Sequence, residues 1–154
     1  MGKSITKNWI HCVWATKNRA PLILPHFEYR LHKFIMDELI KMGCYVENIN
    51  RMEGHIHCLF LLTPKKSMID VVKQIKGSCS RYVNEQNFLN QPFIWQRGFG
   101  AFSVSESGKD NVKQYIKNQK HIHRKRTYLS EYRKLVELHN ASKCLIGDLT
   151  INKL

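Results

Sequence analysis

The 154-residue sequence lacks long hydrophobic runs, repeats and low-complexity tracts. No apolar run approaches the roughly 20 residues that a membrane-spanning helix needs. The N-terminal segment, MGKSITKNWIH, also lacks the apolar core of a signal peptide. We therefore expect a single domain over residues 1–154, located in the cytoplasm and with no membrane partner.

Cysteine occurs in a pattern that argues against both a disulfide framework and a cysteine zinc site. The five cysteines are an odd number, and no two of them have CxxC spacing. We predict that most of them are small core residues in a reducing compartment. They are Cys12, Cys44, Cys58, Cys79 and Cys144.

Negative charge is scarce in this chain. There are 12 Asp and Glu residues against 25 Lys and Arg residues, which gives a formal net charge of +13. Such a surplus on a small domain is typical of a protein that binds a polyanion, most often nucleic acid. The alternative is that the charge serves only to keep the protein soluble.

Hydrophobic periodicity predicts the order β-α-β-β-α-β followed by further helices. This is the order of a ferredoxin-like α+β fold (βαββαβ), in which a four-stranded antiparallel sheet carries two helices on one face. The expected strands are 8–16, 44–52, 55–62 and 93–107. The expected helices are 25–42, 68–82, about 107–123 and about 129–140, and the third of them carries Tyr115.

The third expected strand, HIHCLFLL, is apolar on both faces and opens with two histidines. Because side chains on a strand alternate between faces, His55 and His57 project side by side. A strand that is buried on both sides lies in the centre of its sheet, so the later helices or a second subunit must cover the second face. The histidine pair is either a hydrogen-bonded pair or half of a metal site.

The helix expected over 107–123 carries a stripe of residues at helical spacing: Val112, Tyr115, Ile116 and Gln119. Tyr115 and Gln119 are one turn apart. A buried glutamine needs a partner, because an unpaired amide there costs about 1–3 kcal/mol. A metal ion held by the two histidines is one such partner. The alternative reading of Tyr115 is an ordinary core residue.

The chain contains, in order, the blocks GHIHCLFLL, VVKQIKGSCSRYV, IWQRGFGAFSVS and VKQYIKNQKHIH. Together they resemble the single-tyrosine HUH transposases of small bacterial insertion sequences (the IS200 type). The resemblance runs from about Trp9 to His123. One departure from the family pattern is Gly54, because the family often has Asp or Asn immediately before the first histidine.

The resemblance implies an enzyme that cleaves and rejoins single-stranded DNA at the ends of an insertion element. In the family, the two histidines and a glutamine one turn after the tyrosine bind Mg²⁺ or Mn²⁺, which maps to His55, His57 and Gln119. Tyr115 is then the nucleophile that forms a 5′-phosphotyrosine link and leaves a free 3′-OH. The resemblance also implies a homodimer and DNA hairpins as the binding partner.

Basic residues near these blocks are expected to contact DNA phosphates. The metal and cationic neighbours such as Lys113 or His121 are the alternative groups that we expect to favour the phenolate form of Tyr115. The expected DNA-binding residues are Lys65, Lys66, Lys73, Lys76, Arg81, Lys113, Arg124, Lys125 and Arg126.

Three alternative functions remain open at this point. An HUH replication or relaxase nickase has similar chemistry, although the short chain favours a transposase. A domesticated relative of a transposase is the second alternative. The third is a non-catalytic RNA-binding module, because RNA-recognition domains share the ferredoxin-like order and a basic charge; their usual glycine-aromatic sheet motif is absent here.

Overall fold

The computed structural model describes residues 2–119 together with residues 133, 135 and 137. Its elements are β1 (Trp9–Ala15), the short 3₁₀ helix η1 (Lys17–Arg19), α1 (Pro25–Lys41), β2 (Tyr45–Met52), β3 (His55–Leu61), α2 (Met68–Glu85), β4 (Gly100–Val104) and α3 (Lys109–Lys117). The strands form one antiparallel sheet in the order β2-β3-β1-β4. The predicted ferredoxin-like fold is therefore confirmed.

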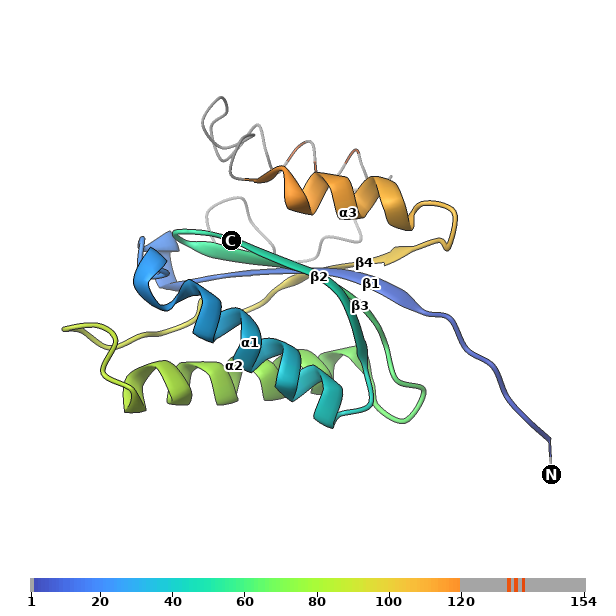
Figure 1. The fold of residues 1–154 in the computed structure, drawn as a ribbon, viewed down its shortest axis with the longest axis horizontal. Coiled ribbons are helices and arrows are strands. Elements are labelled where there is room, and N and C mark those ends of the chain that lie inside the picture. The colour runs from blue at the N-terminus through green and yellow to red at the C-terminus, as the bar shows by residue number, and fades with distance from the viewer. Residues whose placement is uncertain (1, 120–132, 134, 136, 138–154) are drawn as a thin grey trace.

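The sheet is covered on both faces (Figure 1): α1 and α2 lie against one face, and α3 lies across the other. β1 and β3 are the central strands, with Cys12 opposite Cys58 and Val13 opposite His57. Alternation along β3 turns Ile56, Cys58 and Phe60 toward α1 and α2. The same alternation turns the residues between them toward α3, so a later helix covers the second face as the sequence predicts.

The two helices on the first face begin as their sequences predict, whereas α2 extends three residues beyond its predicted end, to Glu85. α1 begins at Pro25, which fits the first turn because proline needs no helical hydrogen-bond partner there. It is followed by Gly43 at φ 87°, a left-handed conformation that favours glycine. At the start of α2 the Ser67 hydroxyl accepts a hydrogen bond from the Asp70 N–H and donates one to the Asp70 carboxylate.

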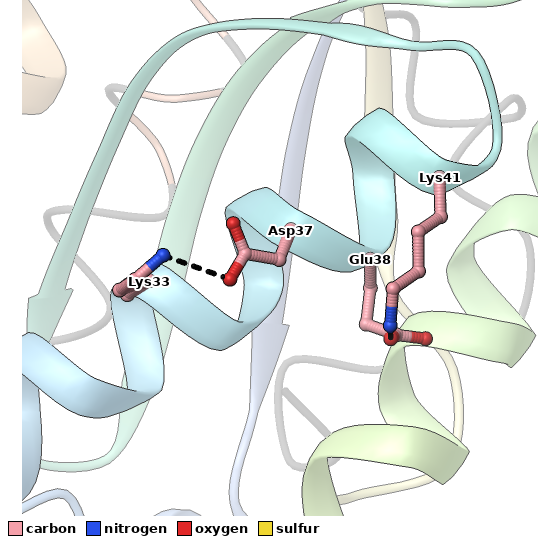
Figure 2. A network of polar contacts seen from close by, with 4 residues as sticks. All are labelled: Lys33, Asp37, Glu38 and Lys41. Carbon is pink, nitrogen blue, oxygen red and sulfur yellow. Dashed lines mark hydrogen bonds and ion pairs between the residues drawn. The ribbon is translucent and has the colours of Figure 1, made fainter.

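Two ion pairs link charged residues along α1 (Figure 2). Lys33 forms an ion pair with Asp37 at 3.0 Å, and Lys41 forms one with Glu38 at 2.9 Å. The hydrogen bond that the Lys33 ammonium donates to Asp37 raises the pKa of Lys33. Acidic residues are scarce in this chain, so the presence of Asp37 and Glu38 leaves α1 less positive than the chain as a whole.

The fourth strand is shorter than predicted. The expected strand 93–107 forms only β4 (Gly100–Val104), and Trp95 makes an isolated bridge to Thr16. The cause lies in the bend between them, where Gly98 has φ 81°. The Lys76 ammonium donates to the Gln96 and Gly98 carbonyls at 2.7 Å each, which takes both carbonyls away from strand pairing.

The third expected helix is interrupted near its C-terminal end. α3 ends at Lys117, and Asn118 caps it with φ −90° and ψ 5°. Gln119 is helical again after this turn residue, and residues 120–123 lie outside the described residues. Most of the helix expected over 129–140 lies outside them too, although Arg133, Leu135 and Glu137 are helical.

None of the helices in the described part of the chain combines the length and the apolar character that crossing a bilayer requires.

Candidate active site

Three buried histidines lie on the α3 side of the sheet. His55 and His57 project from β3, and His11 projects from β1; their exposed fractions are 4 %, 1 % and 0 %. Strand alternation and the antiparallel register of β1 with β3 put all three side chains on the same face. The predicted side-by-side placement of His55 and His57 is present, with ring centroids 5.1 Å apart.

His11 contacts His57 directly. The His11 Nε2 atom lies 3.0 Å from the His57 Nδ1 atom, so one ring donates a hydrogen bond to the other. This contact uses His57 Nδ1 and fixes the orientation of that ring, as the partners of metal-binding histidines commonly do. His11 was not among the site residues predicted from the sequence. Its signal was a histidine in the middle of an otherwise apolar strand, WIHCVWA.

Tyr115 on α3 lies next to this histidine cluster in the same chain. Its ring centroid is 5.9 Å from that of His57 and 6.1 Å from that of His11, both in edge arrangements. The helix is seated by Val112 and Ile116, which pack with Leu59 of β3 in a small apolar cluster. Helical spacing then turns Tyr115 toward the histidines.

Polar contacts from β2 hold α3 in this position. The Asn50 carboxamide donates to the Ile116 carbonyl at 2.8 Å, and the Asn48 carboxamide donates to the Lys113 carbonyl at 3.2 Å. The Lys113 ammonium forms an ion pair with Glu47 at 3.0 Å, and this bond raises the pKa of Lys113. Tyr115 therefore owes its position to β2 as well as to its own helix.

Gln119 is fully buried although it follows the end of α3. Its Nε2 donates to the backbone carbonyl of Tyr115 at 3.3 Å, so the two residues remain linked as the spacing predicted. Its Oε1 atom is buried and has no hydrogen-bond partner among the described residues. A buried acceptor of this kind calls for a ligand or water.

The donor atoms of this cluster fit a divalent cation in part. His57 has its Nδ1 engaged by His11, which leaves Nε2 as its ligating atom, and Gln119 has the buried Oε1. His55 is different, because its Nδ1 lies 3.0 Å from the Arg19 guanidinium. Among the described residues, no cluster of three His, Cys, Asp or Glu side chains has the geometry of a metal site. A cation bound at this cluster therefore needs Gln119 as a ligand in addition to the histidines.

Gly54 departs from the family pattern for a reason that the packing explains. A Cβ atom on residue 54 would lie 2.6 Å from the backbone oxygen of Arg19, a distance that real Cβ atoms do not show. The glycine therefore lets the η1 turn approach the start of β3. Arg19 was not predicted as a neighbour of the site, because nothing in the polar segment TKNRAP indicates a contact with a histidine 36 positions later.

The predicted DNA-binding residues fall into different surroundings. Exposed positions on the α2 side of the sheet hold Lys65, Lys66, Lys73 and Arg81, and none of the four forms an ion pair within residues 2–119. Lys76 instead holds the 96–98 bend, and burial lowers the pKa of its ammonium. The remaining predicted residues, Arg124, Lys125 and Arg126, lie outside the described part of the chain.

Several known proteins are similar to this chain. The family model for IS200-like transposases matches residues 4–119. The ISDra2 transposase TnpA of Deinococcus radiodurans is 25% identical over 114 residues, which cover 71% of this chain and 81% of the relative. A crystal structure of a Deinococcus radiodurans R1 protein described as a transposase has a TM-score of 0.62 and 28% identity, over 77% of this chain and 98% of that one.

A second solved structure shares the fold at lower sequence identity. It is a REP-associated tyrosine transposase bound to a REP hairpin, with a TM-score of 0.58 and 16% identity. The match covers 80% of this chain and 74% of that one.

Proposed function

Because the chain belongs to the family of IS200-like transposases, we propose that it cleaves and rejoins single-stranded DNA at the ends of an insertion element. Tyr115 is the nucleophile, and the cleaved strand is held as a 5′-phosphotyrosine. The observation that carries this proposal is the position of the Tyr115 ring, 5.9 Å from the His57 ring on the same face of the sheet.

The proposed cleavage is a transesterification at phosphorus. The Tyr115 phenolate oxygen attacks the scissile phosphorus and forms a new O–P bond. The bond to the 3′ oxygen breaks, and that oxygen leaves with the electron pair and takes up a proton. Attack by a free 3′-OH on the phosphotyrosine reverses the step and joins two strands. No nucleotide cofactor is needed, because the covalent link conserves the phosphodiester energy.

We propose Mg²⁺ or Mn²⁺ as the cofactor, held by His55, His57 and Gln119. When bound, the cation polarises the scissile phosphate and offsets the charge that gathers on its oxygens. Imidazole ligands suit Mn²⁺ better than Mg²⁺. The protein's own contribution is to orient the ligands: His11 fixes the ring of His57, and Tyr115 and Gln119 are linked through the bond to the Tyr115 carbonyl.

The proposed binding partner is a DNA hairpin, as in the REP-associated relative, which is bound to a REP hairpin. The net charge of +13 favours a polyanion. The exposed cations Lys65, Lys66, Lys73 and Arg81 are the proposed phosphate contacts on the α2 side. We also propose a homodimer, and the edge strands β2 and β4 are the available places for pairing between two sheets.

A covalent-adduct assay tests the nucleophile. The protein is incubated with a hairpin-bearing single-stranded DNA and Mn²⁺, and the products are separated under denaturing conditions. We expect a protein–DNA adduct that Tyr115→Phe abolishes. The matched control is Tyr29→Phe, which removes the same hydroxyl from an exposed position on α1 and keeps the adduct. An adduct that survives in Tyr115→Phe would reassign the nucleophile.

The same assay separates a strand-joining enzyme from a binding module. A second DNA strand with a free 3′-OH is added after cleavage, and we expect the cleaved strand to be transferred to it. An RNA-binding module gives no adduct at all. That alternative is also disfavoured by the fold, because RNA-recognition domains stack bases on the face of the sheet that α3 covers here.

A further inference from the structure

Gly77 occupies an unfavourable position for a glycine. It is an exposed residue near the middle of α2, the helix that runs from Met68 to Glu85. Glycine is the least favourable residue in a helix interior after proline, because it loses the most backbone freedom on folding. A glycine at such a position weakens its helix, so its presence calls for a reason.

Neither packing nor backbone geometry requires this glycine. A Cβ atom added to Gly77 would meet no atom within 4 Å, whereas one added to Gly54 would lie 2.6 Å from a backbone oxygen. Gly77 also has a helical backbone and does not belong to the glycines with positive φ. Alanine would fit here and strengthen the helix. The reason for the glycine therefore lies in something that approaches α2 from outside.

Two exposed cations flank Gly77 along the helix. Lys73 lies one turn before it and Arg81 one turn after it, on the same side of α2. Neither forms an ion pair with another residue that the structure describes. The two cations are about 12 Å apart along the helix axis, with the glycine midway between them. Positive charge on both sides of a bare stretch of helix favours a polyanion.

The side chains beside Gly77 keep this stretch of helix low. The Ser80 hydroxyl donates to the Lys76 and Gly77 carbonyls at 3.1 Å each, so it lies back on the helix. The Lys76 ammonium is held by two carbonyls of the 96–98 bend, at 2.7 Å each. A strand of nucleic acid can therefore come close to the backbone of α2 between the two flanking cations.

We propose that Gly77 is a positioning residue for DNA, which lets the sugar–phosphate backbone of the hairpin stem lie directly against α2 between Lys73 and Arg81. This inference rests on the proposed function. Gly77 donates no hydrogen bond to the strand, because the N–H groups inside a helix are used by the helix itself. It provides room instead, and the attraction between each cation and a phosphate grows as their distance falls.

The paired stem is the part of the DNA that fits this place. α2 and α3 lie on opposite faces of the sheet (Figure 1), and α3 carries the proposed nucleophile Tyr115. The strand that is cleaved must reach the α3 side. The contact on α2 is therefore left to a part of the DNA away from the scissile phosphate.

A second protein chain is the other candidate for a close approach to a glycine. Two helices that pack at a glycine bury apolar side chains around the point of contact. The exposed neighbours of Gly77 on α2 are polar instead, namely Lys73, Gln74 and Arg81. The charges favour DNA, and the oligomeric state of a Gly77 variant tests the alternative.

The first experiment compares stability with hairpin binding, in a Tyr115→Phe background so that the DNA is not cleaved. Gly77→Ala should raise the melting temperature by about 1–4 °C, because it removes a helical glycine. The same variant should bind the hairpin about two- to threefold more weakly, and Gly77→Gln about tenfold more weakly, because a longer side chain keeps the strand from both cations. Unchanged hairpin affinity in both variants would overturn the inference.

The control variant is Ile40→Gln, which introduces the same side chain at an exposed position of α1. It should leave hairpin affinity unchanged. A gain in stability together with a loss of binding at Gly77 is a result that misfolding does not produce.

The second experiment tests whether Gly77 acts through its two neighbours. The salt dependence of duplex binding falls by about 0.9 for each phosphate contact that is lost, so Gly77→Gln should lower it by about 1–2. In a Lys73→Gln, Arg81→Gln background, Gly77→Gln should have little further effect, because nothing then draws the strand close. An undiminished effect in that background would show that the glycine does not serve these cations, and the inference would fail.

Two further measurements identify what approaches the helix. Single-stranded DNA of the same length without a hairpin should lose less than about twofold in affinity on Gly77→Gln, because it has no stem. An equal loss for both DNAs would overturn the assignment to the stem. A change in the sedimentation of DNA-free Gly77→Gln, absent in Ile40→Gln, would assign this surface to a second chain and overturn the inference.

The adduct assay keeps this inference apart from the proposed function. If Gly77→Gln binds the hairpin normally, the role of Gly77 is lost and the adduct formed by Tyr115 stands. If an adduct persists in Tyr115→Phe, the proposed nucleophile is lost, whereas the affinities and salt dependences of the Gly77 variants keep their meaning.

Discussion

The two faces of the sheet differ in what they bury. The face toward α1 and α2 is apolar, and its cluster extends from Ile10 on β1 to Trp95 beyond α2. The face toward α3 has a much smaller apolar cluster, formed around Leu59 and Ile116, and next to it three buried histidines and a buried glutamine. One face holds most of the apolar core, and the other carries the proposed reactive groups.

The difference follows from the cost of burying polar groups. A buried imidazole or carboxamide needs a hydrogen-bond partner, so each polar group on the α3 side brings another with it. His11 pairs with His57, and Arg19 pairs with His55. α3 itself is attached by Asn48 and Asn50 as much as by apolar contact. We therefore expect mutations on the face toward α1 and α2 to lower stability more than activity. Mutations on the face toward α3 should lower activity more than stability.

The largest expected effect on stability comes from the apolar face. Phe60→Ala should lower the free energy of unfolding by about 3–5 kcal/mol, because it removes a fully buried aromatic ring. His57→Ala, three positions earlier on the opposite face, should cost about 1–3 kcal/mol through the loss of its bond to His11 and should also abolish the DNA adduct. Urea denaturation of both variants measures the comparison. Equal losses would show that the α3 side also carries a main part of the stability.

A smaller effect is expected from two lysines on α2. Lys76→Met should cost about 1–3 kcal/mol, because the carbonyls of Gln96 and Gly98 lose their donor. Lys73→Met removes an exposed cation from the same helix and should stay within about 0.5 kcal/mol. Chemical denaturation compares the two variants, and hairpin binding should weaken in Lys73→Met. A destabilised Lys73→Met would contradict this division of roles.

The attachment of α3 predicts a local effect. Asn50→Ala removes the donor to the Ile116 carbonyl, so α3 should open more easily by about 1 kcal/mol, roughly a fivefold loss of amide protection. Hydrogen exchange should show this loss in α3 and no change in α1. Asn8→Ala, at an exposed position, is the control. A uniform loss over both helices would mean that the two faces unfold as one unit.

The smallest expected effect is that of thiol reagents on the folded protein. These reagents should not react with the buried cysteines of the apolar face. Burial raises the pKa of Cys12 to about 12 and also holds the pKa of Cys58 well above its usual value. Thiolate is therefore almost absent at pH 8, and it appears only as the pH approaches 12 or the protein unfolds. Labelling in a Cys144→Ser background tests this, with Ser103→Cys on β4 as an exposed positive control. Rapid labelling of the native background would show that the apolar face opens.

Most of the fold was predictable, because strand alternation and helical stripes are local properties of the chain. His55 and His57 share a face for this reason, and Ser67 marks the start of α2. The errors occur where a distant side chain intervenes. Gly98 and Gly100 are a local signal for a bend in the fourth strand, but the bonds from Lys76 to carbonyls about 20 positions away are not visible in any local pattern. The end of α3 at Lys117 likewise has no signal such as glycine or proline.

By itself, the sequence determined the order of the elements, the paired histidines on one face, the spacing of Tyr115 and Gln119, and the positive charge. Each of these depends only on residues that are close in the chain. Only the tertiary structure decided that Tyr115 lies against His57, that His11 fixes that ring, and that Arg19 occupies His55. These contacts join residues 36 to 58 positions apart, and they depend on how the η1 turn and a docked helix meet one sheet face.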